Sequence, residues 1–370
     1  MRGVGAWASG AAGLLLVLLA SASVVRTLLM PGSRVGFLLY GIDQGTDRLF
    51  RLATRWMARP EGRSRARSVH APLILAVQLW SWLALYLLGF ALMLWPITHG
   101  LGSALRESGS SLVTLGFAAS RSGRAAIVDL FAAATGLIVV ALQIAYLPTL
   151  YGAFNRREAD VALLTMRAGE PAWGPELLAR VHLMGSLPEL GSFYETWERW
   201  AADVAESHSS YPVLLRFRAP NPQSSWLIGL LAVLDSAALY ASIAPEQAPI
   251  QARLFLRMGF GCLQQLARTV GIPYDADPRP DAGIKLTEAE FRHGIARLRD
   301  YGFPIKRPVE EVWVHFQGWR VNYESIVYSL AFAIDAPPAL WSGPRRIPTA
   351  PAEPRRLRDR TPEDPEGAQV

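Results

Sequence analysis

The sequence predicts an all-α integral membrane protein with a helical soluble domain, and three observations carry this prediction. Of the 370 residues, 51% are apolar and only 18% are charged, below the roughly 25% usual for soluble domains. The apolar residues gather in long runs near the N-terminus, and arginines sit between and after these runs. The 37 basic and 31 acidic residues leave a net charge of only +6, which disfavours a disordered or nucleic-acid-coating protein.

Three apolar runs are long enough to cross the bilayer as helices, since about 30 Å of hydrocarbon takes about 20 helical residues. They cover residues 5–29, 73–97 and 125–150. The first run follows Arg2 and could be a cleaved signal peptide, with residues 20–22 as its cleavage-like site. Its apolar length exceeds a typical signal-peptide core, so we predict an N-terminal transmembrane span over residues 1–30.

The segment between the first two runs, residues 31–70, is rich in arginine and is therefore expected to be cytoplasmic. Its apolar residues recur at helical spacing opposite its arginines, which indicates an amphipathic helix on the inner leaflet or a linker packed on the soluble domain. The apolar positions are Val35, Leu38, Leu39, Ile42, Leu49, Ala53 and Trp56, and the arginines are Arg48, Arg51, Arg55 and Arg59. This orientation places the N-terminus outside and all residues after 155 in the cytoplasm.

The C-terminal half predicts a helical cytoplasmic domain over residues 155–342, followed by a tail, residues 343–370, that is disordered by composition. The apolar run 224–243 could be a fourth span, but Asp235 in its middle favours a buried helix of the domain. Arginines alternate with apolar residues over 212–220. This pattern allows a clasp for an anion or an acidic neighbouring subunit, although a packing segment is the simpler interpretation.

Motifs for enzyme chemistry are missing from the sequence. No GxGxxG, Walker, HExxH or nucleophile-elbow pattern occurs. The single cysteine, Cys262, leaves no disulfide framework or multi-cysteine metal site. His208 lies near Asp203 and two serines, but helix capping explains this group better than a hydrolase site. We therefore expect no enzyme activity, no cofactor and no bound metal beyond a passing monovalent cation.

The segment between the second and third runs, residues 101–124, is too short and too polar to cross the membrane. Its first half is helical in character, and its second half contains the apolar core 112–118. We predict a re-entrant loop, with a short helix from about residue 103 to residue 112 and an extended return. Non-helical backbone at membrane depth needs protein around it, so the loop requires neighbouring copies. A glycine turn in a protein without a pore is the alternative.

The order of these parts resembles the pore domain of the potassium-channel superfamily. An outer helix, a pore helix, a filter written TVGYG and a Gly-Arg that opens an inner helix follow one another in that family. The corresponding pore domain here covers residues 71–154, with Gly123 and Arg124 as the Gly-Arg pair. The filter corresponds to TLGFA, which is Thr114, Leu115, Gly116, Phe117 and Ala118. Gly136 and Pro148 take the places of the family's gating hinge and inner-helix bend.

The resemblance implies a channel that conducts K⁺, or monovalent cations with weak selectivity, without a chemical step. Because one loop supplies a quarter of the carbonyl ring, it implies a homotetramer in the lipid bilayer. The whole chain also looks like bacterial proteins described as channel-like membrane proteins. We therefore expect a multi-pass protein of the bacterial inner (plasma) membrane, gated by its inner helix under control of the C-terminal domain and an unknown cytosolic ligand. A non-conducting sensor or scaffold that retains the pore fold is the alternative.

The filter sequence departs from the family at its outer end. Carbonyls can line one axis only if alternate residues are left-handed, and Gly116 accepts this geometry freely. Ala118 stands where the family has its second glycine, and a left-handed alanine costs about 1–2 kcal/mol. We therefore expect the outer filter to relax. Two further positions allow two interpretations each: Gly136 as hinge or as helix contact, and Asp129 beside the ion path or among headgroup-level polar groups, of which we favour the latter.

Overall fold

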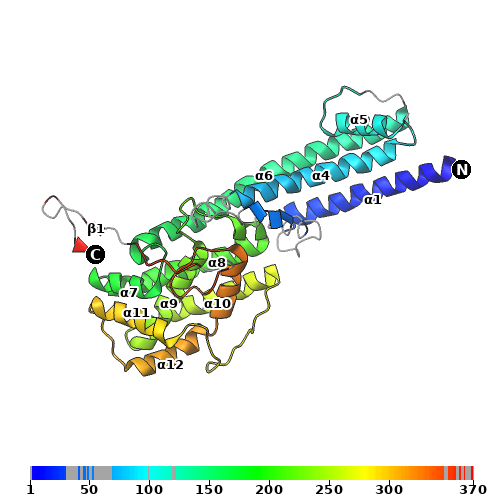
Figure 1. The fold of residues 1–370 in the computed structure, drawn as a ribbon. Helices are drawn as coiled ribbons and strands as arrows, with labels where there is room; N and C mark the ends of the chain where they lie inside the picture. Colours follow the sequence, from blue (N-terminus) through cyan, green and yellow to red (C-terminus); the bar gives the residue numbers. More distant parts are fainter. Residues whose placement is uncertain are drawn as a thin grey trace. The chain divides into compact units, whose positions relative to one another are not determined.

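The structure, a computed structural model, consists of two compact units, which are unit 1 (Met1–Trp56 and Val69–Gly152) and unit 2 (Met57–Ser68 and Ala153–Val370). The residues that it describes are 2–30, 41, 45–46, 48–49, 52–53, 69–98, 100–118, 122–345, 349–355, 358–359, 362 and 368–369. Almost all regular structure in these residues is helical (Figure 1). The all-α class is therefore confirmed.

Unit 1 contains α1 (Arg2–Leu28), α4 (His70–Leu94), α5 (Leu101–Leu112) and the first part of α6 (Gly123–Ala168). By length and composition, α1, α4 and α6 could each cross a membrane, as could α9 (Trp226–Ile243) of unit 2. Four such helices in the described part of the chain are the pattern of a multi-pass membrane protein.

Helix α1 packs along α4 through two glycines (Figure 1). A Cβ atom on Gly13 would lie 2.4 Å from the Gly89 carbonyl oxygen, and a Cβ atom on Gly89 would lie 2.8 Å from Val17 Cγ2. Helices in lipid associate through close backbone packing at small residues, because burial of apolar side chains provides no hydrophobic driving force there. The first span therefore belongs to the same bundle as the predicted outer helix.

Polar side chains add hydrogen bonds to the same contact. Ser21 Oγ and Tyr86 Oη lie 3.0 Å apart, and Trp82 Nε1 donates to Ser23 Oγ at 3.0 Å. Tyr86 and Trp82 are almost fully buried in the apolar cluster that α1, α4, α5 and α6 share. These two bonds join α1 to α4 at two positions along the helix and so restrain the rotation of α1 about its own axis.

Helix α6 is one uninterrupted helix of 46 residues that passes through Gly136 and Pro148. The sequence predicted that the third span ends near residue 150, but the helix continues to Ala168. It ends there because Gly169 is left-handed, with φ +76°, a common helix terminator. The division between the two units falls inside this helix, between Gly152 and Ala153.

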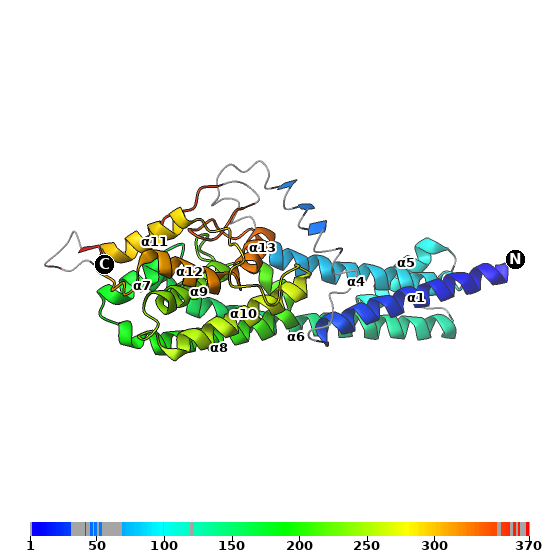
Figure 2. The same ribbon diagram turned by 90° about the horizontal axis from the view of Figure 1, so that it is seen from below.

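Unit 2 surrounds α9, in which all 18 residues are buried. Helices α7, α8, α10, α12 and α13 pack against it, and Figure 2 shows α8, α9 and α10 side by side. The remaining helices and turns of the unit are α7 (Gly174–Leu183), η1 (Leu187–Glu189), α8 (Leu190–Ser210), η2 (Pro212–Arg216), α10 (Ile250–Val270), α11 (Glu288–Asp300), α12 (Val309–Arg320) and α13 (Glu324–Ile334). Although α9 is apolar enough for a span, its place is the core of unit 2.

Asp235 lies in the middle of α9, fully buried and paired. Its Oδ1 accepts hydrogen bonds from Arg320 Nη1 at 2.6 Å and from the Tyr323 hydroxyl at 2.7 Å. Arg320 is also fully buried, and its Nε donates to Glu324 Oε1 at 3.0 Å. This network lets an acidic residue occupy the centre of an apolar helix, since a buried charge is tolerated only when it is paired.

The tail begins with residues that pack on unit 2, which corrects its predicted disorder from residue 343 onward. Arg345 is buried and donates to backbone carbonyls, among them that of Ala336 at 2.6 Å. The Arg355 N–H donates to the Glu170 carbonyl at 2.8 Å. Composition did not indicate this because backbone hydrogen bonds, and not an apolar core, hold the segment.

Further along the tail, β1 (Arg358–Asp359) pairs antiparallel with β2 (Ala368–Gln369). The predicted amphipathic helix of the arginine-rich segment lies mostly outside the described residues. It therefore stays a prediction.

Candidate functional site

The short helix predicted from about residue 103 to residue 112 is present as α5, which begins two residues earlier than expected and ends at Leu112 as expected. Its last turns carry three serines, and each makes a specific bond. Ser108 is fully buried, and its Oγ donates to the Leu87 carbonyl of α4 at 3.0 Å. This bond fixes α5 to the outer helix.

The end of α5 is a left-handed turn centred on Thr114, whose φ is +56°. The Thr114 N–H donates to the Ser111 carbonyl at 3.0 Å, and the Leu115 N–H donates to the Ser110 carbonyl at 2.8 Å. These two bonds form a Schellman motif, in which glycine is the usual left-handed residue. A threonine at this position costs about 1–2 kcal/mol of backbone energy, so other contacts must hold the turn.

Left-handed geometry recurs two residues later at Gly116, where φ is +69°. Ala118 is not among the described residues with positive φ, and its N–H donates to Ser110 Oγ at 3.1 Å. Ala118 was expected to relax out of left-handed geometry, whereas a left-handed non-glycine residue at Thr114 was not expected. The Schellman motif at the end of α5 requires the left-handed residue at Thr114.

The side chains of this loop lie largely outside the core of their own chain. Leu115 is 65% exposed and Phe117 is 57% exposed. The Arg106 guanidinium lies 5.5 Å from the centroid of the Phe117 ring, close enough for a cation–π contact. Within one chain, residues 114–117 are thus exposed, with the Arg106 side chain of α5 beside the Phe117 ring.

Two contacts join the inner helix α6 to the C-terminal end of α5. Ser111 Oγ donates to Asp129 Oδ1 at 2.9 Å. A Cβ atom on Gly136 would lie 1.9 Å from the Leu112 carbonyl oxygen, so the two backbones touch at this point. Asp129 therefore bonds to α5, and Gly136 makes the helix contact that was one of its two interpretations.

The three serines form a brace that sequence reasoning did not identify. Ser108 bonds to α4, Ser110 bonds to the loop through the Ala118 N–H, and Ser111 bonds to α6. The sequence signal was available, because four of the five residues 108–112 are serine or glycine at the end of a helix between apolar spans. The brace holds the loop of Thr114, Leu115, Gly116, Phe117 and Ala118 in place relative to both neighbouring helices.

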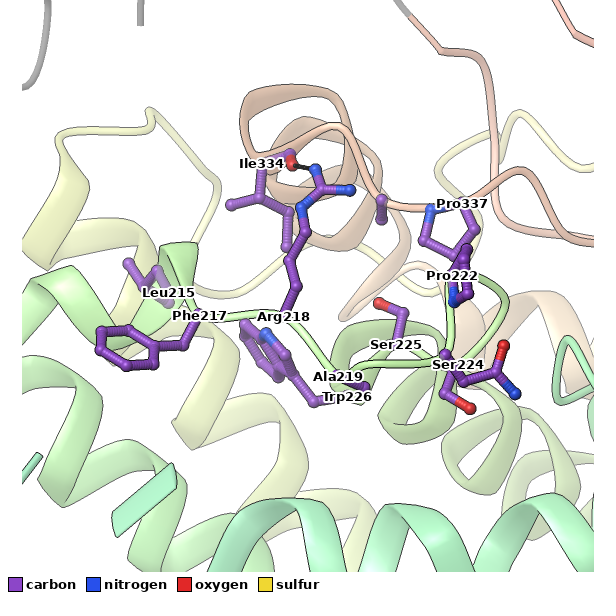
Figure 3. Close-up of a pocket in the computed structure, with 12 residues that line it drawn as sticks. Leu215, Phe217, Arg218, Ala219, Pro222, Ser224, Ser225, Trp226, Ile334 and Pro337 are labelled. Atoms are coloured by element: carbon purple, nitrogen blue, oxygen red, sulfur yellow. Dashed lines mark hydrogen bonds between the residues drawn. The ribbon is translucent and has the colours of Figure 1, made fainter. Parts of the chain in front are cut away.

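The arginine segment 212–220 in unit 2 proves to be a packing segment. Arg216 Nη1 donates to the Ala333 carbonyl at 3.2 Å, and Arg218 Nη2 donates to the carbonyls of Ile334 and Asp335, the latter at 2.8 Å. Both arginines thus cap the C-terminus of α13, where cations are favoured. Figure 3 shows Arg218 reaching Ile334 across a pocket of only about 20 Å³, room for about one water molecule.

His208 does not form a hydrolase-like group with Asp203. It is fully buried, its Nε2 lies 2.7 Å from Arg157 Nη1, and its Nδ1 lies 3.0 Å from Ser207 Oγ. Since the guanidinium can only donate, Nε2 is an acceptor and the ring is neutral. Asp203 instead pairs with Arg156 at the surface.

The His208 environment predicts a pH-dependent stability. Burial, and then the charge of Arg157, holds the pKa of His208 well below its usual range. Below about pH 6.5 the unfolded chain binds a proton at this ring that the folded chain does not, so the contribution of His208 to stability falls by about 1.4 kcal/mol for each unit by which the pH is lowered. Thermal unfolding of the detergent-solubilised protein between pH 7.5 and 5.5 measures this loss.

His208→Gln removes the titrating ring and is expected to reduce the slope. His315→Gln is the matched control, because His315 is half exposed, and it is expected to retain the full slope. Equal slopes for the parent and His208→Gln would contradict a neutral buried His208.

In the described part of the chain, no group of three or more His, Cys, Asp or Glu side chains is arranged to hold a metal ion. Comparison with protein-family models, with curated proteins and with solved structures gives no match to this chain.

Proposed function

We propose that the chain is one subunit of a homotetrameric channel for K⁺ or other monovalent cations, with backbone carbonyls of Thr114, Leu115, Gly116, Phe117 and Ala118 around a shared axis. The observation that carries the proposal is left-handed geometry at alternate residues, Thr114 and Gly116, after a short helix between two apolar helices. Alternation of this kind is what a carbonyl-lined path requires. The pore helix also directs the negative end of its dipole toward the loop.

The exposure of the loop supports an assembly of several chains. Exposed Leu115 and Phe117 need a partner at membrane depth, and neighbouring copies of the same loop supply it. Crosslinking in a mild detergent should then stop at four chains. A distribution that ends at one or two chains would contradict a shared axis.

Weak ion selectivity is expected because left-handed geometry stops before Ala118. The Ala118 N–H is engaged by Ser110 Oγ, so the outer end of the filter is held in a different conformation from that of Thr114 and Gly116. Fewer ordered carbonyl rings discriminate less between K⁺ and Na⁺. Flux ratios between the two ions should therefore be small.

Gly116→Ala tests the conducting path. An added Cβ at φ +69° costs about 1–2 kcal/mol in each subunit, or about 4–8 kcal/mol in a tetramer, although the space around Gly116 is open. We expect K⁺ flux from loaded liposomes to fall at least about tenfold. Gly102→Ala is the matched control, because Gly102 is helical with open space around its Cβ position, and its flux should be unchanged.

The alternative is a non-conducting membrane-anchored sensor or scaffold, and one observation favours it. The Leu115 N–H bonds back to the Ser110 carbonyl, so the loop begins by folding against its own helix. A tetramer without flux, and with Gly116→Ala equal to the parent, would select this function.

The proposed orientation places unit 2 in the cytoplasm of a bacterial cell whose inner membrane holds unit 1. Helix α6 belongs to both units, so a ligand of unit 2 could act on the inner helix directly. Protease added outside intact spheroplasts should leave unit 2 uncut. Cleavage of unit 2 under these conditions would reverse the orientation.

A further inference from the structure

An open cavity of about 540 Å³ lies within unit 2, among α6, α7, η1 and α8. Its volume is in the range of about 300–1,000 Å³ that small-molecule sites occupy. Most of its wall is apolar and includes Leu163, Met166, Met184, Phe193 and Trp197. Three of these side chains, Leu163, Met166 and Met184, are at least half exposed. Neither the proposed pore nor the buried ion pairs of unit 2 involve this cavity.

The charges on the cavity wall are unequal. Two carboxylates, Asp160 and Glu189, face one guanidinium, Arg167, which leaves an excess of one negative charge. Arg167 is already engaged, since its guanidinium lies 5.5 Å from the centroid of the Phe193 ring. An arriving anion would therefore meet two carboxylates and a cation that already has a partner.

Asp160 is a carboxylate on this wall that has no partner among the described residues. Its side chain is partly buried, and burial raises the pKa of its carboxyl above the usual value. No ion pair or hydrogen bond of this carboxyl occurs within the described part of the chain. A partly buried carboxylate without a partner is stabilised by a cation that enters the same space.

We propose that this cavity binds an organic cation with an apolar body. The ammonium group lies near Asp160, and the apolar part covers the methionine and leucine side chains beside the Phe193 ring. Burial of the apolar body supplies the non-directional part of the affinity, while Asp160 supplies the preference for positive charge. A neutral molecule of the same shape would leave Asp160 unpaired.

The test compares three probes of one shape on the full-length protein in detergent. The probes are 2-phenylethylammonium, neutral 2-phenylethanol and the anion phenylacetate, and titration calorimetry against micelle blanks measures each binding constant. We expect saturable binding, with the highest affinity for the cation and the lowest for the anion. The cation should bind about fivefold or more tightly than the neutral probe. Equal binding of all three probes, or no saturable binding of the cation, would overturn the proposal.

Asp160→Asn locates the site. It keeps the size of the side chain and is expected to weaken the cation about fivefold while leaving the neutral probe unchanged. Glu246→Gln is the matched control, because Glu246 is an exposed carboxylate that does not line the cavity, and it should bind the cation like the parent. A cation affinity unaffected by Asp160→Asn would place binding elsewhere. The readout is binding alone, so loss of the channel proposal would not affect it.

Discussion

Replacing Gly136 with alanine is expected to separate α6 from the C-terminal end of α5. The new Cβ would lie 1.9 Å from the Leu112 carbonyl oxygen and 2.9 Å from its carbonyl carbon. Both atoms belong to the backbone, so no side-chain rotation relieves the clash, and one of the helices must move. Overpacking of this kind costs about 1–3 kcal/mol or more.

The displacement should reach the loop because the two helices share a second contact nearby. Ser111 Oγ holds Asp129 Oδ1 at 2.9 Å, and a shift of α6 large enough to admit a methyl group breaks that bond or moves α5 with it. We expect both a lower melting temperature and loss of K⁺ flux in liposomes. A hinge role alone would predict altered gating with an unchanged melting temperature.

Gly123→Ala provides the control in the same helix. Gly123 is the first residue of α6, and nothing lies within 4 Å of its Cβ position. This variant should melt and conduct like the parent. If Gly136→Ala also behaves like the parent, the close approach of α5 and α6 is wrong.

The elements of unit 1 were predictable because bilayer thickness sets the length of each span. Residues 73–97 and 125–150 read as spans from hydropathy alone, and α4 and α6 contain nearly all of them. Helix α5 was predictable because its sequence is helical in character but too short and too polar to form a further transmembrane span. The end of α6 was not, since the charged residues from Arg156 onward mark the end of the apolar run and not the end of the helix, which continues to Ala168.

The contacts of the loop were not predictable from local pattern. Thr114 gives no signal of a left-handed turn, because glycine is the residue that normally indicates one. The approach of Gly13 to Gly89 joins residues far apart in the sequence, and the apolar patterns of both helices would allow other faces to pack. The serine brace was visible in composition, but its partners, Leu87 and Asp129, lie on other helices.

Loss of Arg320 is expected to have the largest effect on unit 2. Its guanidinium is fully buried and serves four neighbours: Asp235 at 2.6 Å, Glu324 at 3.0 Å, the Trp341 carbonyl at 2.6 Å and the Tyr328 hydroxyl at 3.1 Å. Arg320→Met preserves most of the side-chain volume but leaves two buried carboxylates without their cation. Removing one partner of a buried pair costs about 3–5 kcal/mol, which the melting temperature of the solubilised protein should register.

A double variant separates the charge effect from the loss of packing. Asp235→Asn in the Arg320→Met background removes one unpaired charge and is expected to recover part of the lost stability, whereas Asp235→Asn alone is expected to destabilise. If Asp235→Asn lowers the stability of the parent but raises that of the Arg320→Met variant, the two residues are energetically coupled. Arg292→Met is the exposed control: Arg292 pairs with Glu288 at the surface, where such pairs contribute about 0–1 kcal/mol. If Arg320→Met and Arg292→Met lower the melting temperature equally, Arg320 is not what allows α9 to bury Asp235.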